Sequence, residues 1–484
     1  NTGNDFIYPD NYKDNIENYL EITGQSSKLI GGGFSKLSTN TETDGRYHSN
    51  WLNMMYPRLK LAKNLLTDDG VIFISIDDNE EGNLKKMCDE IFGEDNFIAN
   101  LIRRTRKGGG SMSKYISSDH DYILVYTRKI SSLNRFLVPY NKDYLKRYNE
   151  EDEKSKFFWD TFARNRQGSS NNYTITAPDG QKLKKAWIYK KDKYEQLLKE
   201  GEIRFKKLNN SWSVQIKQRI NKGQIMRSIL NDFINKKGTK TINDLLGNEI
   251  FTYTKPVELT EYFLNLTKND DIILDFFSGS GTTAHSVLKS NLEKNKHNNF
   301  ILIQIPEPTD EKSEAYKAGY KNICEIGKER IRRAGDKILE ESDNKDLDIG
   351  FKVFKLDSSN LQKWDPDYKN LTESLDNYVD NIKTDRTEED LVYEIMLKYG
   401  IDLTLPIQKE NTENHTIYSV GHGALLICLD DNITKDITKP IIDLGKDSIS
   451  TRVVFKDNGF KSDSDKTNIK ETLKVNNIKE FITI

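Results

Sequence analysis

The chain has 484 residues, which is enough for roughly two or three domains that each bury a core. Its longest apolar runs, VIFISI at 71–76 and ALLICL at 424–429, are far too short to cross a bilayer, so we expect a soluble cytoplasmic protein with no membrane partner. The three cysteines, Cys88, Cys324 and Cys428, have no metal-binding spacing, and we expect reduced thiols and no bound metal.

The net charge of −2 hides an uneven distribution. Residues 131–240 contain 25 Lys and Arg against 12 Asp and Glu, whereas residues 341–484 contain 19 against 28. A basic segment interleaved with aromatic residues suits a nucleic-acid backbone with bases to stack on, although a lysine-rich surface in water gives the same count. The aromatic residues of this segment are Phe157, Phe158, Trp159, Tyr173, Trp187, Tyr189 and Trp212.

The first predicted elements are an amphipathic helix over 51–66 and a strand over 71–76, joined by a turn at Asp68-Asp69-Gly70. The continuous apolar run of the strand is typical of a buried strand in a parallel sheet. Asp77 follows it directly, at the edge where doubly wound sheets bind ligands. We therefore predict a place for Asp77 in a ligand site; the alternative is that it caps a helix beginning near Glu80.

A second helix, over 80–92, leads to a strand near 97–104, and another buried strand follows at 122–128. Between them lies RRTRKGGGSMSKYISSDHD, with the composition of a surface loop. Four cations precede its three glycines, and they suit contacts with phosphates, although a plain linker would have the same composition. These cations are Arg103, Arg104, Arg106 and Lys107.

Residues 270–308 predict a strand, a glycine turn, a helix and a second strand, which together form a βαβ unit. The turn lacks the lysine of a P-loop and the third glycine of a dinucleotide fold, which argues against a nucleoside triphosphate and against hydride chemistry. Gly279 and Gly281 let a ligand approach the backbone closely, and Asp275 offers a carboxylate beside Phe276 and Phe277. This set suits an amino acid joined to a purine nucleoside.

LDFFSGSGTTAHSV at 274–287 resembles the S-adenosylmethionine motif of amino-methylating DNA methyltransferases, in the version found in modification subunits of type III restriction-modification systems. NEIFTYTKPVELTEYFLNLT at 248–267 resembles the opposite wall of that cofactor pocket, and further likeness lies in 45–80, 319–338, 350–360 and 388–407. The resemblance implies a Rossmann-like α/β fold with permuted motif order, an inserted target-recognition domain and a C-terminal α+β domain. The implied boundaries are 1–130 for the target-base half, 131–245 for target recognition, 246–340 for the cofactor half and 341–484 for assembly with partners.

The resemblance also implies which residues bind the cofactor. They are Thr254, Lys255, Pro256, Val257 and Glu258 on one wall, and Asp275, Phe276, Phe277, Ser278, Gly279, Ser280, Gly281 and Thr282 in the turn. Related enzymes hold the ribose hydroxyls with an acidic residue after the next strand. Gln304 stands there, and Glu307 is an alternative. We expect His285 to be a packing residue.

The implied reaction is methylation of adenine N6 in duplex DNA, carried out by a homodimer that also binds a restriction helicase-nuclease subunit. The chain does not contain the Asp-Pro-Pro-Tyr motif that holds the amine in this family. We expect that motif directly upstream of Asn1, which would place Asn1, Thr2, Gly3 and Phe6 beside the target base. A DNA-recognition and assembly protein without catalysis, and a cytosine-N4 methyltransferase, are the alternatives.

Overall fold

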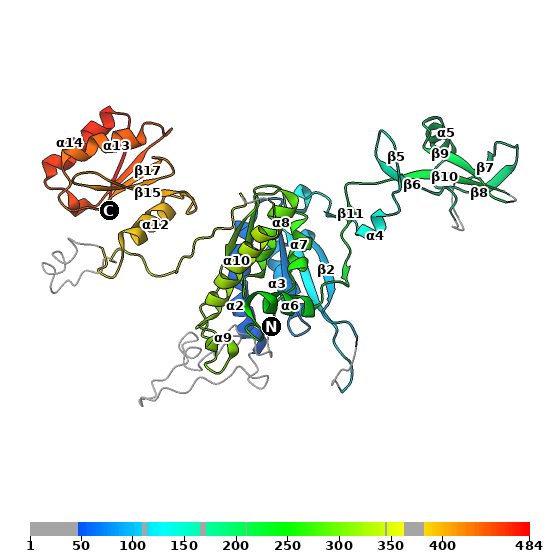
Figure 1. The fold of residues 1–484 in the computed structure, drawn as a ribbon, viewed down its shortest axis with the longest axis horizontal. Coiled ribbons are helices and arrows are strands. Elements are labelled where there is room, and N and C mark those ends of the chain that lie inside the picture. The colour runs from blue at the N-terminus through cyan, green and yellow to red at the C-terminus, as the bar shows by residue number, and fades with distance from the viewer. Residues whose placement is uncertain (1–46, 109–113, 165–170, 210, 344–345, 363–381) are drawn as a thin grey trace. The chain divides into compact units, whose positions relative to one another are not determined.

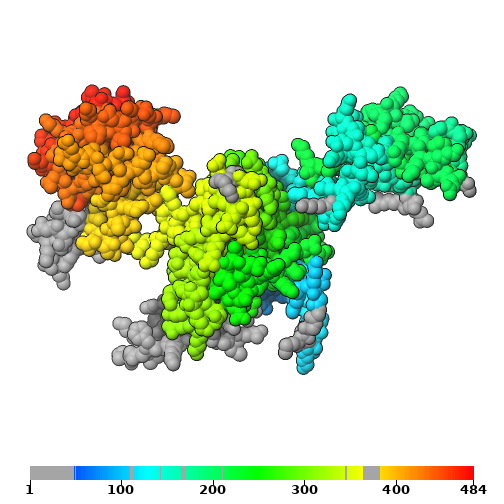
Figure 2. Space-filling model, in the orientation of Figure 1, coloured from blue at the N-terminus to red at the C-terminus, as the bar shows by residue number. Residues whose placement is uncertain are grey.

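The computed structural model describes residues 47–484 apart from 109–113, 165–170, 210, 344–345 and 363–381. The chain divides into two compact units, Asn1–Ile349 and Gly350–Ile484 (Figure 1). The second unit is drawn from yellow to red in Figures 1 and 2. It begins after Ile349, whereas the sequence predicts that the last domain begins after residue 340. No helix in the described part of the chain is long and apolar enough to cross a membrane.

The first unit begins with a sheet that two helices cover. Its strands are β1 (Val71–Ile76), β2 (Phe97–Arg104), β3 (His120–Thr127) and β12 (Ile229–Leu230), in the order β1-β3-β2-β12. Helices α2 (Tyr47–Leu65) and α3 (Glu81–Phe92) contribute Trp51, Leu59 and Leu84 to a core that includes Tyr126 of β3. The predicted helices and strands are thus present.

The parallel pairing predicted for residues 71–76 is wrong. β1 runs antiparallel to β3, with Val71 opposite Thr127, and β2 is also antiparallel to β3. In this sheet only β12 and β2 pair in parallel. A continuous apolar run reports burial on both faces, and burial does not fix the direction of the neighbouring strand.

The βαβ unit at 270–308 is confirmed. β13 (Ile272–Asp275) pairs in parallel with β14 (Asn299–Leu302), and α8 (Thr282–Lys294) connects them. The neighbouring helices are α6 (Asn235–Leu246), α7 (Val257–Leu264), the short α9 (Glu314–Lys317) and α10 (Ile323–Glu340). Helices α7 and α10 both pack against α8, so the glycine turn at its start is enclosed by helices.

Residues 150–219 form a module with its own core. One sheet has the order β5-β6-β10-β9, and a hairpin joins β7 to β8. The elements are β5 (Glu150–Glu151), β6 (Lys156–Thr161), β7 (Asn172–Thr176), β8 (Lys182–Ala186), α5 (Lys191–Lys199), β9 (Ile203–Lys207) and β10 (Trp212–Arg219). Phe162, Trp187, Tyr194 and Ile216 are buried together in its core. Short elements connect the module to the β1–β3 sheet: η3 (Ile130–Ser132), β4 (Leu137–Val138), α4 (Lys142–Leu145) and β11 (Gln224–Ile225).

The second unit is a mixed sheet in the order β15-β16-β17-β18-β19 with helices on both faces. Its elements are α12 (Glu388–Lys398), β15 (Ile407–Asn411), β16 (Thr416–Val420), β17 (Leu425–Cys428), α13 (Thr438–Gly445), β18 (Arg452–Phe455), α14 (Asp463–Val475) and β19 (Glu480–Thr483). Alternate strand residues face α13 and α14 on one side and α12 on the other. The unit therefore contains both strands and helices.

Candidate functional site

The glycine turn after β13 is held in a defined shape. Gly279 and Gly281 have φ of 52° and 74°, in the left-handed region that favours glycine, and the Gly281 amide donates to the Ser278 carbonyl at 2.9 Å. The Asp275 carboxylate accepts from the Phe277 amide at 3.1 Å and from the Thr283 hydroxyl at 2.6 Å. Burial outweighs these two hydrogen bonds and raises the pKa of Asp275, so the carboxylate gains from a cationic ligand.

Helix α10 supports the turn from behind through close backbone contact. A Cβ added to Gly281 would lie 3.3 Å from the carbonyl oxygen of Gly327, and one added to Gly327 would lie 3.4 Å from that of Gly279. Glycine on both sides therefore allows helix and turn to touch.

The predicted opposite wall meets the turn through a cluster of hydroxyl groups. Thr254 Oγ1 lies 3.0 Å from Ser280 Oγ and 3.1 Å from Thr282 Oγ1, and all three side chains are buried. Pro256 then caps α7, whose first turn contains Val257 and Glu258. The two sequence-predicted halves of the cofactor site are thus brought together.

At the centre of this cluster lies Arg330, which the sequence reasoning missed. Its Nη1 donates to the hydroxyls of Thr254, Ser280 and Thr282 at 2.8, 2.7 and 2.7 Å. The side chain is fully buried, and its Nε and Nη2 have no hydrogen-bond partner among the described residues. Burial lowers the pKa of Arg330 to about 10, and the guanidinium stays charged at neutral pH.

A signal for Arg330 was present in the sequence. The buried face of α10 repeats at helical spacing, and Arg330 falls on that otherwise apolar stripe. Arg332 and Arg333, its basic neighbours in the same run, point to the surface and contact Glu329.

A family model described as DNA methylase matches residues 12–315, which is more than half of the chain. The chain belongs to this DNA methylase family. Among its relatives is the type III restriction-modification enzyme StyLTI Mod subunit of Salmonella typhimurium, 37% identical over 380 residues that cover 75% of this chain and 56% of that protein. The EcoPI Mod subunit of Escherichia phage P1 is 30% identical over 515 residues, covering 96% and 76%.

The methylase thus matches little more than half of the length of the StyLTI subunit. A solved structure of an M1.HpyAVI–SAM complex is 14% identical, with a TM-score of 0.25 over 58% of this chain and 82% of that chain. This low score supports no conclusion about the present fold.

Gln304 supports the methylase turn directly. Its Oε1 accepts from the Gly279 amide at 2.8 Å, and its Nε2 donates to the Ile305 carbonyl at 3.1 Å. The amide is therefore engaged with the turn. Because its oxygen can accept two hydrogen bonds and its nitrogen can donate two, the predicted contact with ribose hydroxyls stays a prediction. His285 is a buried packing residue on α8, as expected, and burial lowers its pKa to about 3.

Asp77 does not cap a helix. Helix α3 begins after Glu80 without a side-chain cap, and Asp77 Oδ1 accepts from the Asn79 amide at 3.1 Å. Burial raises the pKa of Asp77, while the charge of Lys255 on the predicted cofactor wall acts in the opposite direction. The carboxylate therefore stays a candidate for the site.

Arg103 has a structural role, and the predicted phosphate contact is wrong for this residue. Strand alternation turns it inward from β2, where it is fully buried. Its Nε donates to Asp121 Oδ1 at 2.7 Å, and Lys255 Nζ donates to Asp121 Oδ2 at 2.8 Å. Burial alone would raise the pKa of Asp121, but these two cations outweigh it and hold the pKa below its usual value.

The other three predicted phosphate-binding cations lie at or near the surface. Arg106 contacts Asp119 at 3.0 Å, and Lys107 lies 3.7 Å from Asp232. Arg104 is half-buried and donates to the carbonyl oxygen of Arg106. A groove of about 460 Å³ runs beside them, lined by Thr105, Arg106, Lys107, Ile234, Asn235 and Lys236. Its charge suits a phosphate, and the contact stays a prediction.

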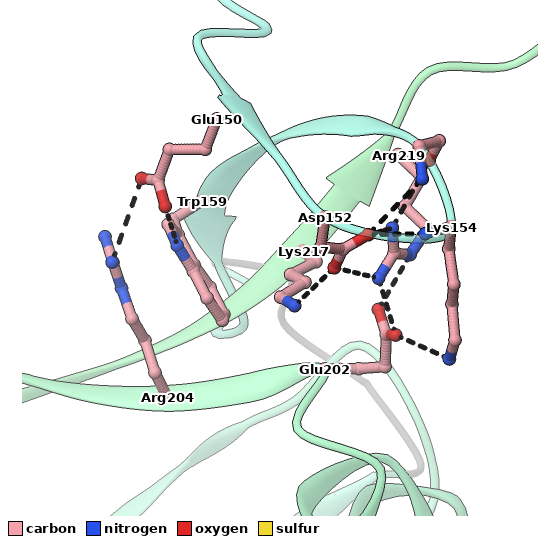
Figure 3. A network of polar contacts seen from close by, with 9 residues as sticks. Glu150, Asp152, Lys154, Trp159, Glu202, Arg204, Lys217 and Arg219 are labelled. Atoms are coloured by element: carbon pink, nitrogen blue, oxygen red, sulfur yellow. Dashed lines mark hydrogen bonds and ion pairs between the residues drawn. The ribbon is translucent and has the colours of Figure 1, made fainter.

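The basic segment neutralises part of its own charge (Figure 3). Asp152 accepts from Lys217 at 2.7 Å and from Arg219 at 2.6 Å, and Glu202 accepts from Arg219 at 2.8 Å and from Lys154 at 3.1 Å. The hydrogen bonds of this network lower the pKa of both acids. Its cations are therefore partners of acidic groups within the module.

Some aromatic residues of the segment are buried and others are exposed. Trp187 and Phe157 are buried, so they cannot stack on a base, contrary to prediction. The Trp159 ring is covered by the Arg204 guanidinium at 4.2 Å, and its Nε1 donates to Glu150 at 3.0 Å (Figure 3). Tyr189 is exposed. Asn1, Thr2, Gly3 and Phe6 lie outside the described residues.

Proposed function

We propose that the chain is an S-adenosylmethionine-dependent DNA methyltransferase subunit of a type III restriction-modification system, and that its target is adenine N6. The observation that carries this proposal is the buried contact between Thr254 of one predicted cofactor segment and Ser280 and Thr282 of the other, with Arg330 at its centre. Family membership supports the reaction class, and the Mod subunit relatives support the system.

The residues fit the proposed cofactor. Asp275 is fixed by two hydrogen bonds beside the turn, and its raised pKa favours a partner such as the ammonium of the methionine part. Gly279 and Gly281 leave room for close approach to the backbone, and Phe277 is partly exposed beside them. S-adenosylmethionine supplies an electrophilic methyl group when bound. The chain contributes placement of that group, which is the main requirement for transfer to an amine.

The adenine amine needs acceptors that hold its hydrogens while the nitrogen attacks. In the family this is the work of the Asp-Pro-Pro-Tyr motif, which the 484 residues do not contain. We propose that acceptors of this kind hold the amine of a target base that is turned out of the duplex. Asp77 and the turn then bind the cofactor part of the same pocket.

We propose that the 150–219 module reads duplex DNA through the outward face of the β7–β8 hairpin. Lys182 and Lys184 are exposed there opposite Thr176 and Thr174, and no ion pair is found for either lysine within the described part of the chain. Cations without acidic partners are the ones that can replace counterions on phosphates. Binding through these lysines weakens steeply with salt. Arg106 and Lys107, beside the basic groove, would first have to exchange Asp119 and Asp232 for a phosphate.

The Mod subunit relatives support a proposal about partners. We propose that the methyltransferase acts as a homodimer, and that the unit Gly350–Ile484 takes part in assembly with its second copy or with a restriction helicase-nuclease subunit. Size-exclusion chromatography with light scattering tests the first assembly, and co-purification with a restriction subunit tests the second.

The decisive experiment is transfer of tritiated methyl from S-adenosylmethionine to duplex DNA by the full protein, followed by nucleoside analysis. We expect N6-methyladenine, and loss of transfer in Asp275→Asn with DNA binding retained. Detection of N4-methylcytosine instead would show that the target is cytosine N4 and not adenine N6. DNA and cofactor binding without transfer would instead favour the DNA-recognition and assembly protein.

A further inference from the structure

Three side chains of metal-binding type meet at one end of the sheet in the unit Gly350–Ile484. β16 and β17 are antiparallel, with Tyr418 opposite Ile427, so the start of β16 lies beside the end of β17. His415 precedes β16, Cys428 ends β17, and Asp430 follows two residues later. One ligating atom from each of the three lies within 4.8 Å of the others.

The distances suit a small divalent ion. Asp430 Oδ2 lies 3.6 Å from Cys428 Sγ and 3.6 Å from His415 Nδ1. Ligands on a tetrahedral zinc ion, at bond lengths of about 2.0–2.3 Å, lie roughly 3.3–3.7 Å from one another. The carboxylate is oriented by the Thr416 amide, which donates to the same oxygen at 2.6 Å.

His415 provides an independent indication. The residue is only 5% exposed, and its Nδ1 has no hydrogen-bond partner among the described residues, which is costly for a buried polar atom. The other ring nitrogen, Nε2, lies 3.4 Å from both Asp436 Oδ1 and Thr434 Oγ1. A carboxylate behind the imidazole is the arrangement that fixes the ring and tautomer of a metal-bound histidine.

The Asp436 carboxylate is itself held in place. Asn414 donates to its Oδ2 at 2.8 Å. A carboxylate held beside Nε2 accepts the hydrogen of that ring nitrogen and so favours the tautomer with the proton on Nε2. The Nδ1 lone pair then faces Cys428 and Asp430.

We propose that His415 Nδ1, Cys428 Sγ and Asp430 Oδ2 bind a zinc ion, with water in the fourth position on the partly exposed side of Asp430. A set of imidazole, thiolate and carboxylate suits zinc, whereas calcium and magnesium prefer oxygen ligands alone. On binding, the Cys428 thiol releases its proton to solvent. The ion would link the start of β16 to the end of β17, and all three ligands belong to the unit Gly350–Ile484.

The sequence expectation of no bound metal rested on cysteine spacing alone. The candidate site uses one cysteine, and its histidine stands thirteen residues earlier, so no familiar spacing reveals it. The competing interpretation is direct contact of His415 with Asp430 and Asp436, with Cys428 as a buried, inert thiol. Burial does raise the pKa of that thiol to about 12 without a metal.

The test uses the full chain, stripped of metal, loaded with Zn²⁺ or Co²⁺ and dialysed. We expect one zinc per chain, a thiolate-to-cobalt charge-transfer band, and loss of both in Cys428→Ser and Asp430→Asn. Asp436→Asn should weaken zinc binding by about 10–100-fold. The matched controls are Cys324→Ser and Asp431→Asn, since Asp431 neighbours the cluster but pairs with Lys456 at 3.0 Å.

Absence of zinc from the wild type would overturn the proposal and leave the direct contacts of His415 with the two carboxylates. Undiminished zinc in Cys428→Ser would overturn it as well. If Cys428→Ser does not fold, the cobalt band of the wild type decides. That band must persist in Cys88→Ser and Cys324→Ser, which leaves Cys428 as the thiolate, and its absence from the wild type would refute the site.

Discussion

Replacement of Arg330 by methionine should weaken S-adenosylmethionine binding while changing global stability little. The substitution removes the donor that holds Thr254, Ser280 and Thr282 together at 2.7–2.8 Å. One charge-assisted hydrogen bond is worth about 1.5–3 kcal/mol, so we expect roughly a 10- to 100-fold loss of affinity if this energy holds the turn in its binding shape.

Two features of the structure limit the cost to the fold. The three hydroxyls still contact one another at 3.0 and 3.1 Å, so they are not left without partners. The wild type also buries a guanidinium with no acidic partner among the described residues, and methionine removes that desolvation penalty while filling much of the volume. We therefore expect the free energy of unfolding to change by only about 1 kcal/mol.

The assay pairs calorimetric titration of S-adenosylmethionine with urea unfolding of the same variant. Arg332→Met is the matched control, because Arg332 lies on the same helix with an exposed side chain and should leave both quantities unchanged. Unaltered cofactor affinity in Arg330→Met would refute the positioning role. A loss of several kcal/mol in unfolding free energy would show that Arg330 supports the fold as a whole.

Four further substitutions test other parts of the molecule. Gly238→Ala places a Cβ 2.4 Å from the Thr254 carbonyl oxygen, so it should lower the free energy of unfolding by about 1–3 kcal/mol and weaken cofactor binding. Gly82→Ala, in open space on α3, should raise the free energy of unfolding by about 0.5–1 kcal/mol. Urea unfolding measures both changes. Burial lowers the pKa of His285 to about 3, whereas the unfolded chain has the usual value of about 6.5. The unfolded chain therefore binds a proton that the folded chain does not, and the free energy of unfolding falls as the pH is lowered from about 6.5 toward 3. His285→Gln should flatten that dependence by up to about 1.4 kcal/mol per pH unit, and an unchanged slope in acid unfolding would contradict it. Lys184→Gln should weaken duplex binding equally across sequences and reduce the salt slope by about one, and an unchanged slope in fluorescence anisotropy would exclude Lys184 from phosphate contact.

The cofactor turn could be predicted because its signal is local. Strand, glycines and helix are adjacent in sequence, and the left-handed glycines and the βαβ unit follow from them. Arg330 could not be assigned in the same way, since its partner Thr254 lies 76 residues away. Its position on an apolar helical stripe marks it as buried, but only the fold shows what the guanidinium contacts. Strand direction was likewise a long-range property, and the prediction for residues 71–76 failed there.

Charge counting predicted a basic segment but overstated how many of its cations can reach DNA. Within that segment Arg219 is bound to Asp152 and Glu202, and Lys217 is bound to Asp152. Outside the segment, Arg103 is buried against Asp121. A cation that already holds an acidic partner releases few counterions on meeting a phosphate, so these residues add little to affinity. The exposed lysines of β8 are different, because no acidic group is paired with them among the described residues. Net charge therefore indicates the kind of partner, whereas the pattern of internal ion pairs selects the face that can bind it.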